Sequence, residues 1–202
     1  MGFSINDFPL KPRFEFALEK ARDFLIELEI CTLPIDSFKL AELLDLGPIP
    51  FSKLNLPIWD GVDGFIQKNR FEAEQIFYND YISSKERTRW TIMHEIGHSM
   101  LGHLNYEEVL FYDDQMPEDQ YGILEVEAHY FASEVLAPTA VLKALNVQCH
   151  TDIMRLCGLS DEAARIRKKR FDHQDRWGTF DEMDQQIVDQ FHDFIKRHPL
   201  CM

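Results

Sequence analysis

The sequence predicts an α+β fold that is mainly helical, with a small antiparallel sheet or hairpin beside one central helix. Apolar residues recur at helical spacing in several long segments, most clearly in residues 13–30 and 121–137. Two short β-favouring runs, 64–68 and 75–78, are joined by a polar connection, as in a β-hairpin. With 202 residues, 45% of them hydrophobic, the chain is long enough to bury a substantial core.

Two helices are predicted ahead of the hairpin. Residues 13–30 should form a packing helix with charged side chains on its outer face. A second helix should begin with Asp36 or Ser37 as its N-cap and end at Gly47. Prolines and glycines interrupt regular structure over residues 48–64, so we expect a loop with one short strand there.

The central helix carries the motif His94-Glu95-Ile96-Gly97-His98. Residues four apart lie on one face of a helix, so the two imidazoles can bind a single metal ion. Glu95 projects from nearly the same side, where it can take a proton from a metal-bound water. The segment Ser83-Ser84-Lys85-Glu86 is typical of a capping box and Gly102 of a helix end, so the motif should lie inside a helix.

A catalytic zinc usually takes three protein ligands, so a third ligand is needed. The metzincin pattern is excluded because Leu101 and Leu104 stand where it requires Gly and His. The next helical segment, 121–137, offers three acidic residues beside an apolar stripe that should pack against the motif helix. Glu127 is the preferred ligand among them, ahead of Glu125 and Glu134.

The sequence around both segments resembles the ImmA/IrrE family of zinc metallopeptidases. The stretch RTRWTIMHEIGHSMLGH is similar to the metal-binding helix of the family, and EVEAHYFASEVLAP is similar to the helix that follows it. An N-terminal helix, the hairpin and the later stretch RLCGLSDEAARIR occur in the family's order. The resemblance implies a zincin-like metallopeptidase core over residues 1–170 and a C-terminal helical extension, 171–202, packed on or near the core.

Carried over by position, the resemblance implies a gluzincin-like site in which His94, His98 and Glu127 bind Zn2+ and Glu95 is the catalytic glutamate. Bound zinc would lower the pKa of its water from about 15.7 toward about 7. Glu95 would remove the proton as the water attacks a peptide carbonyl, and would then pass it to the leaving amine.

Two residues depart from the family pattern: His129 stands where Asn is usual, and Trp90 where Phe is usual. The change at His129 affects the groups that would contact the metal ligands, so Glu125 remains an alternative ligand.

Other residues are candidates for supporting the ligands or the reaction. Glu134 could hydrogen-bond a ligand histidine and fix its tautomer. Candidates for stabilising the oxyanion are Tyr130, His103, Tyr112 and Tyr121.

The chain is strongly acidic, with a net charge of −14 from 35 acidic and 21 basic residues. Such a surface disfavours nucleic acid and anionic membranes, so neither is an expected partner. An acidic loop, 105–120, could select a basic substrate segment, act as a lid, or merely connect two helices. Four widely spaced cysteines and the absence of a leader pattern indicate a reduced, cytoplasmic protein.

The resemblance implies a site-specific endopeptidase that cleaves a helix-turn-helix transcriptional repressor and so relieves repression in a mobile element, a phage or a stress response. The hairpin could bind an extended substrate through an edge strand, or could merely cover the helices. One alternative function is a catalytically silent module that binds a repressor or toxin. The other is a DNA-binding regulator, because residues 151–170 have the outline of a helix-turn-helix with a local basic patch.

Overall fold

The structure, a computed structural model, is mainly helical and contains one small sheet among its described residues, which confirms the predicted fold class. The described residues are 8–54, 61–106, 118–177 and 180–199, without the side chains of 118–121 and 177. Most of the acidic loop 105–120 therefore lies outside the described residues, as do Tyr112 and the side chain of Tyr121. Within the described part of the chain, no helix is both long and apolar enough to cross a membrane.

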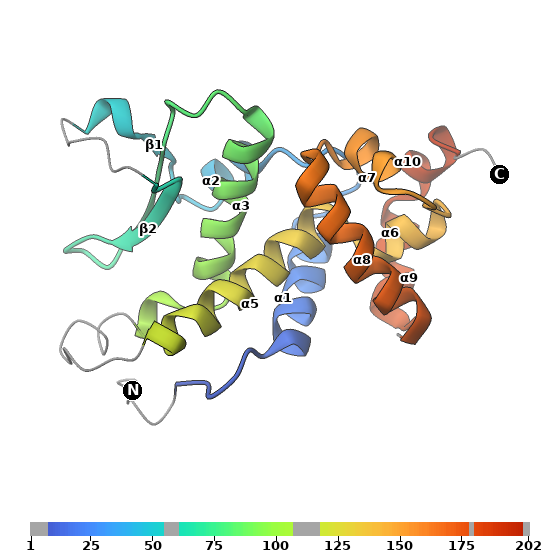
Figure 1. Cartoon of the computed structure of the whole chain (residues 1–202), viewed down its shortest axis with the longest axis horizontal. Coiled ribbons are helices and arrows are strands. Elements are labelled where there is room, and N and C mark those ends of the chain that lie inside the picture. Colours follow the sequence, from blue (N-terminus) through green and yellow to red (C-terminus); the bar gives the residue numbers. More distant parts are fainter. Residues whose placement is uncertain (1–7, 55–60, 107–117, 178–179, 200–202) are drawn as a thin grey trace. The chain divides into compact units, whose positions relative to one another are not determined.

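The chain forms two compact units (Figure 1). Unit 1 comprises residues 1–18 and 36–132 and contains the sheet and the motif helix. Unit 2 comprises residues 19–35 and 133–202 and contains the later helices.

The sheet of unit 1 has three strands in the order β1-β3-β2. Its strands are β1 (Ile49–Pro50), β2 (Gly64–Lys68) and β3 (Glu74–Tyr78), and a 3-10 turn, η2 (Phe51–Lys53), follows β1. β2 and β3 pair antiparallel, with buried Ile66 opposite buried Ile76, which confirms the predicted hairpin. β1 is the predicted short strand, but it lies parallel to β3, so the sheet is mixed rather than purely antiparallel.

The motif His94–His98 lies in α3 (Lys85–Met100), as predicted. The sequence predicts a capping box that starts at Ser83, but the N-cap is Ser84, whose hydroxyl accepts a backbone N–H of the first turn. The Glu86 carboxylate accepts a hydrogen bond from this hydroxyl at 2.9 Å and so helps to hold the Ser84 side chain in its capping position. Gly102 adopts a φ of 71°, a left-handed conformation that ends the helix where the sequence predicts.

α5 (Glu118–Leu136), which belongs to unit 1 as far as residue 132, crosses α3 at close range (Figure 1). Gly97 permits this approach. A Cβ at this position would lie 3.1 Å from the Phe131 ring and 3.2 Å from the Ala128 carbonyl oxygen, closer than side chains normally pack. The crossing therefore brings this part of α5 against the histidines of the motif.

α1 (Phe14–Glu27) and α2 (Ser37–Leu43) are the two helices predicted at the N-terminus. Asp36 caps α2 by accepting a hydrogen bond from the Lys39 backbone N–H at 3.3 Å, as predicted. α2 ends before the predicted stop because Asp45 already adopts a left-handed φ of 57°. In unit 1, α2 packs against α3.

Unit 2 contains the remaining helices. They are α6 (Thr139–Ala144), α7 (His150–Cys157), α8 (Asp161–Trp177), α9 (Glu182–Gln190) and α10 (His192–Arg197). The sequence predicts helices over residues 139–145 and 151–157, close to the observed α6 and α7. It predicts a third over 160–170, and α8 continues beyond this end. The expected division between residues 170 and 171 thus falls inside α8.

In the C-terminal segment the sequence predicts one helix, opened by a capping box at Thr179-Phe180-Asp181-Glu182, whereas the structure has two, α9 and α10. Thr179 lies outside the described residues, and α9 begins with a capping box made by Asp181 and Asp184. Within unit 2, α9 packs against α6, and Asp181 accepts a hydrogen bond from Arg22 of α1 at 2.8 Å.

A buried arginine links the helices of unit 2. Arg167 of α8 is 2% exposed, and its guanidinium donates to Glu134, to Thr139, to Gln174 and to the Ala137 carbonyl at 2.8–2.9 Å. Glu134 also accepts the Thr139 backbone N–H and hydroxyl, both at 2.7 Å. The cation and the carboxylate therefore satisfy each other where water does not reach them.

Replacing Arg167 with Ala should destabilise the protein by about 3–5 kcal/mol, because it leaves the buried Glu134 carboxylate without its counter-charge. Chemical denaturation measures this change. Arg165→Ala is the matched control, since Arg165 is exposed on the same helix and forms an exposed ion pair with Asp161, so it should unfold almost as the wild type does. Equal stability of the two variants would contradict the assignment of Arg167 as the central link.

Candidate metal centre

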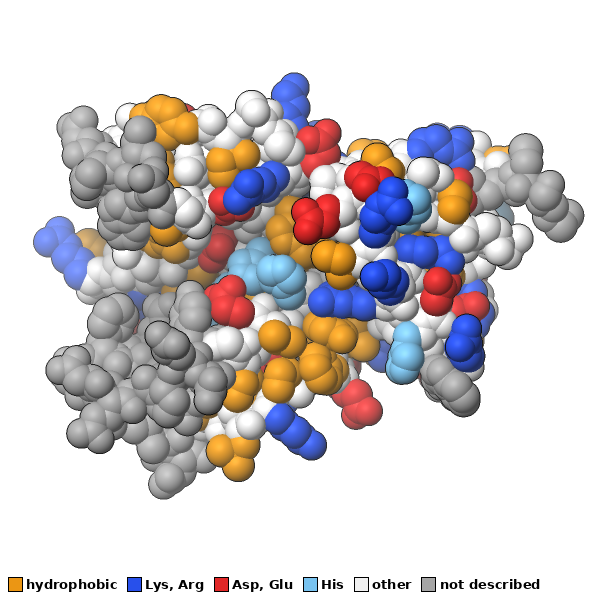
Figure 2. Space-filling model, viewed as in Figure 1, with side chains coloured by type: hydrophobic (Ala, Val, Ile, Leu, Met, Phe, Trp, Pro, Cys, Tyr) orange, Lys and Arg blue, Asp and Glu red, His pale blue; other side chains and the backbone are white. Residues whose placement is uncertain are grey.

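Three potential metal ligands converge in unit 1: His94 and His98 of α3 and Glu125 of α5. His94 Nε2 lies 3.1 Å from His98 Nε2 and 3.1 Å from Glu125 Oε2. His98 Nε2 lies 3.3 Å from Glu125 Oε1. Figure 2 shows histidine side chains gathered beside acidic ones where α3 and α5 cross. Among the residues with described side chains, this is the one group of metal-binding type.

The spacing and chemistry of these atoms fit a zinc ion. Zinc bonds of about 2.0–2.2 Å in a tetrahedral arrangement place neighbouring donor atoms about 3.3–3.5 Å apart, close to the observed separations. Burial alone would raise the pKa of Glu125, but hydrogen bonds from His94 and His98 outweigh it and hold this pKa well below its usual range. The carboxylate is therefore ionised at neutral pH, as a metal ligand must be.

Glu127, the ligand preferred from the sequence, has a different position. Its fully buried carboxylate accepts hydrogen bonds from the Arg13 backbone N–H at 2.7 Å and from the Arg13 guanidinium at 2.9 and 2.7 Å. It also lies 3.2 Å from His103 Nε2. Two residues along a helix correspond to a rotation of about 200° around its axis. Glu125 and Glu127 therefore point to nearly opposite sides and cannot both face the motif. The structure places the alternative, Glu125, beside the two histidines.

Both motif histidines contact another histidine through the ring nitrogen that faces away from the three converging donors. His98 Nδ1 lies 3.0 Å from His103 Nδ1, and His94 Nδ1 lies 3.2 Å from His129 Nδ1. Trp90 packs edge-on against the His129 ring at 5.5 Å between centroids. The two departures from the family pattern, Trp90 and His129, thus lie together behind one motif histidine.

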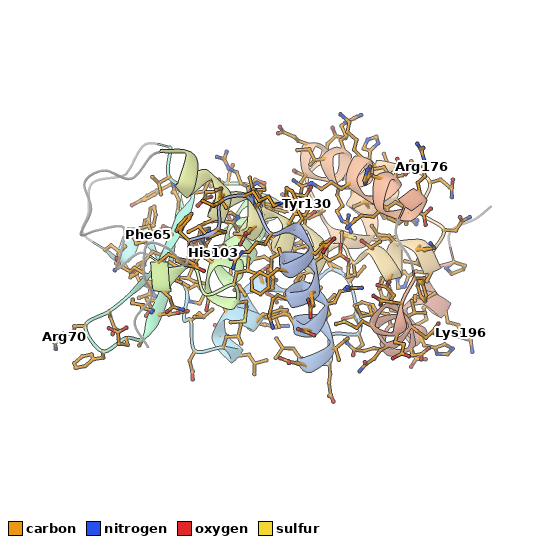
Figure 3. All side chains as sticks on the ribbon, turned by 90° about the horizontal axis from the view of Figure 1, so that it is seen from below. Phe65, Arg70, His103, Tyr130, Arg176 and Lys196 are labelled. Carbon is orange, nitrogen blue, oxygen red and sulfur yellow. The ribbon has the colours of Figure 1, made fainter. Side chains whose placement is uncertain are left out.

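The groups behind His98 have strongly shifted pKa values. Burial would raise the pKa of Glu127, but hydrogen bonds from His103 and Arg13 lower it to about 2. Burial lowers the pKa of His103 to about 4, although the hydrogen bond to Glu127 opposes this shift. At neutral pH, Glu127 is therefore charged and His103 is neutral. His103 lies inside unit 1, with 2% of its surface exposed (Figure 3).

Comparison with known families gives the site its context. The family model for the IrrE N-terminal-like domain, peptidase M78, matches residues 55–169. This match covers more than half of the chain and includes α3 and α5. The chain belongs to the IrrE N-terminal-like peptidase family. Arg13 and α1 precede the matched region, so the arginine that holds Glu127 comes from outside the family match.

Among curated proteins, no significant match to this chain is found. One similar solved structure is a Mycobacterium tuberculosis transcriptional regulator that is 17% identical to this chain, with a TM-score of 0.42. The similarity covers 73% of this chain and 50% of that one, so this member of the IrrE N-terminal-like family spans about half of that structure.

The other residues singled out in the sequence have varied surroundings. Glu95 is buried in α3 next to His94. Tyr130 packs its ring against Phe14 at 4.5 Å between centroids. Both carboxylate oxygens of Glu134 bind partners within unit 2, so the structure supports an architectural role for Glu134 rather than the predicted contact with a ligand histidine.

The helix-turn-helix outline is present as α7 and α8, joined at Gly158 with a left-handed φ of 60°. Its basic patch is smaller than the sequence suggests. Arg167 is buried, Arg165 pairs with Asp161, and Lys168 pairs with Asp172. Figure 2 shows basic and acidic side chains interspersed over α8. This mixed surface does not favour binding to the phosphates of DNA.

Replacing Glu125 with Ala should weaken zinc binding by more than about 100-fold, because it removes one of the three converging donors rather than a group behind them. Competition with a chromogenic chelator measures the affinity. Val126→Ala changes the exposed neighbour on the same helix and should bind zinc as the wild type does. Wild-type affinity in the Glu125 variant would show that Glu125 is not a ligand.

Proposed function

We propose that this chain is a zinc-dependent endopeptidase whose metal ligands are His94, His98 and Glu125 and whose general base is Glu95. The observation that carries the proposal is the convergence of two imidazole nitrogens and one ionised carboxylate within a zinc-like spacing. Membership of a peptidase family supports the same chemistry.

Bound zinc would supply a Lewis acid that polarises the scissile carbonyl and acidifies a water molecule. The protein's own contribution to the reaction is a proton transfer. The Glu95 carboxylate accepts the proton of the attacking water and donates it to the leaving nitrogen of the substrate. Glu95 follows His94 directly on α3, and the burial of this helix segment holds the carboxylate in a fixed position.

The sheet offers a means of holding an extended substrate. In the order β1-β3-β2, β2 forms an outer edge, and it packs against α3. A peptide that adds to β2 as a further strand would gain backbone hydrogen bonds and run beside the motif helix. The turn after β2 exposes Phe71, and Arg70 points outward from the same turn (Figure 3). These side chains offer the substrate apolar and cationic contacts.

The proposed substrate is a helix-turn-helix transcriptional repressor in the cytoplasm, cut at a specific site so that repression ends. The resemblance of the two motif helices to the ImmA/IrrE family supports this substrate class. The alternative is a catalytically silent module that binds the repressor without cutting it.

Co-expression with candidate repressors, starting with any encoded nearby, separates these functions. Wild type should produce one new cut, identified by mass spectrometry of the intact repressor. Glu95→Gln should keep the zinc and lose the cut, because the amide cannot accept the proton. Glu86→Gln, an exposed change on the first turn of α3, should cut as the wild type does.

The negative outcomes of this experiment are also informative. A cut that persists unchanged in Glu95→Gln would contradict the role of Glu95. A repressor that stays intact with wild type but co-purifies with it would favour the binding module over the peptidase.

A further inference from the structure

We infer that residues 8–14 form a strap along α5, with Phe8 and Arg13 as positioning residues that keep Glu125 turned toward the motif histidines. The strap holds α5 from the side that faces away from Glu125. The inference deepens the proposed function and rests on it where the metal is concerned. The order of α5 can be measured without any metal, so the two can be tested separately.

The first anchor of the strap is Phe8, which is 7% exposed. Phe8 forms a buried apolar cluster with Tyr106, which follows α3, and with Leu124 of α5, and Ile123 packs against this cluster. The rings of Phe8 and Tyr106 meet edge-on at 5.2 Å between centroids. Phe8 therefore joins the residues that follow α3 to an early turn of α5.

The second anchor is Arg13, which donates three hydrogen bonds to the buried Glu127 carboxylate. One comes from the backbone N–H at 2.7 Å, and two come from the guanidinium at 2.9 and 2.7 Å. Two parallel hydrogen bonds between planar groups fix orientation as well as distance. Phe14, the next residue, packs its ring against Tyr130 further along α5.

The strap touches α5 at intervals of three residues, at Leu124, Glu127 and Tyr130. Because each residue turns a helix by about 100°, these three lie about 100°, 160° and 220° around the axis from Glu125, measured in one direction. The strap therefore follows the side of α5 that faces away from Glu125. Its contacts fix the rotation of α5 around its own axis.

The crossing at Gly97 holds α5 at a later turn, because the α5 residues closest to Gly97 are Ala128 and Phe131. Glu125 precedes this crossing along the chain. The Phe8 cluster supplies an anchor just before Glu125, so the glutamate lies between two fixed points of the helix.

Between its anchors the strap carries Pro9 and Pro12, whereas Leu10 and Lys11 are exposed. A proline ring restricts φ and so lowers the conformational entropy that the segment loses when it becomes ordered. The strap is thus attached at its two ends and stiffened between them.

Replacing Phe8 with Ala should weaken zinc binding by about 10-fold, because α5 then no longer holds Glu125 in one position. Competition with a chromogenic chelator measures the affinity. Leu10→Ala is the matched control within the strap, since Leu10 is 92% exposed, and it should bind zinc as the wild type does. Phe8→Leu keeps an apolar side chain in the cluster and should restore the affinity.

A second control separates positioning from a general loss of stability. Phe194 is a phenylalanine of unit 2 that is 3% exposed, so Phe194→Ala removes a similarly buried ring away from α5. This variant should be less stable than the wild type but should bind zinc with unchanged affinity.

Hydrogen exchange of the metal-free protein follows α5 itself. Phe8→Ala should accelerate exchange at the backbone N–H groups of residues 123–127 by about 10-fold or more, because this part of α5 loses its anchor. The N–H groups of residues 129–132, beyond the crossing at Gly97, should exchange as in the wild type. Leu10→Ala should change neither group.

If Phe8→Ala does not fold, Arg13→Lys replaces it in both measurements. Lysine keeps a cation beside the buried Glu127 but cannot form the two parallel hydrogen bonds of the guanidinium. Both zinc affinity and hydrogen exchange should then change in the same direction as expected for Phe8→Ala.

The outcomes separate this inference from the proposed function. If Phe8→Ala matches Leu10→Ala in both measurements, the strap is wrong while the peptidase stands. If Phe194→Ala weakens zinc binding as much as Phe8→Ala does, the effect is a general loss of stability and the positioning role is contradicted. If hydrogen exchange changes as expected but the wild type binds no zinc, the strap is supported and the proposed metal site is contradicted.

Discussion

The close crossing of α3 and α5 at Gly97 determines which side chains can meet in unit 1. A side chain larger than hydrogen at residue 97 would press against the Phe131 ring and the Ala128 carbonyl oxygen. At this separation, a carboxylate of α5 reaches the histidines of α3 directly. The position of each glutamate around the α5 axis then decides whether it faces these histidines. Glu125 faces the two histidines, while Glu127 points to the opposite side, where Arg13 and His103 bind it.

Burial gives the two glutamates different chemical roles. Glu125 is only partly buried and lies where an ion could reach it. Glu127 is fully buried and receives three hydrogen bonds from Arg13, so its charge is satisfied inside the protein. A buried ion pair adds little to stability when its desolvation is counted, but it can enforce one arrangement of its neighbours. At Glu127 this neighbour is His103.

Local sequence patterns predicted the elements well, because caps and periodicity act over a few residues. Asp36 caps α2 as expected, and the hairpin has the expected strands. Where nearby residues offered equivalent choices, the pattern was less exact: α3 is capped by Ser84 rather than Ser83, and the parallel pairing of β1 depended on contacts distant in sequence.

The position of His94 and His98 was also predictable, since their spacing alone places them on one helical face. The acidic member of the group was not, because Glu125 and Glu127 stand in similar local sequence and differ only in which neighbour each faces. The partner that occupies Glu127 is Arg13, 114 residues away in the chain, and no local signal marks it. His129 was noticed only as a departure from a family pattern, and its contact with His94 required the structure.

In the proposed site, Glu125 binds the metal and Glu127 does not. An anomalous difference map at the zinc absorption edge, from crystals of the zinc-loaded protein, tests it most directly. We expect one strong peak within about 2.0–2.2 Å of His94 Nε2, His98 Nε2 and a Glu125 oxygen, with Glu127 still bound to Arg13. A peak coordinated by Glu127, or a metal bound away from α3, would contradict it.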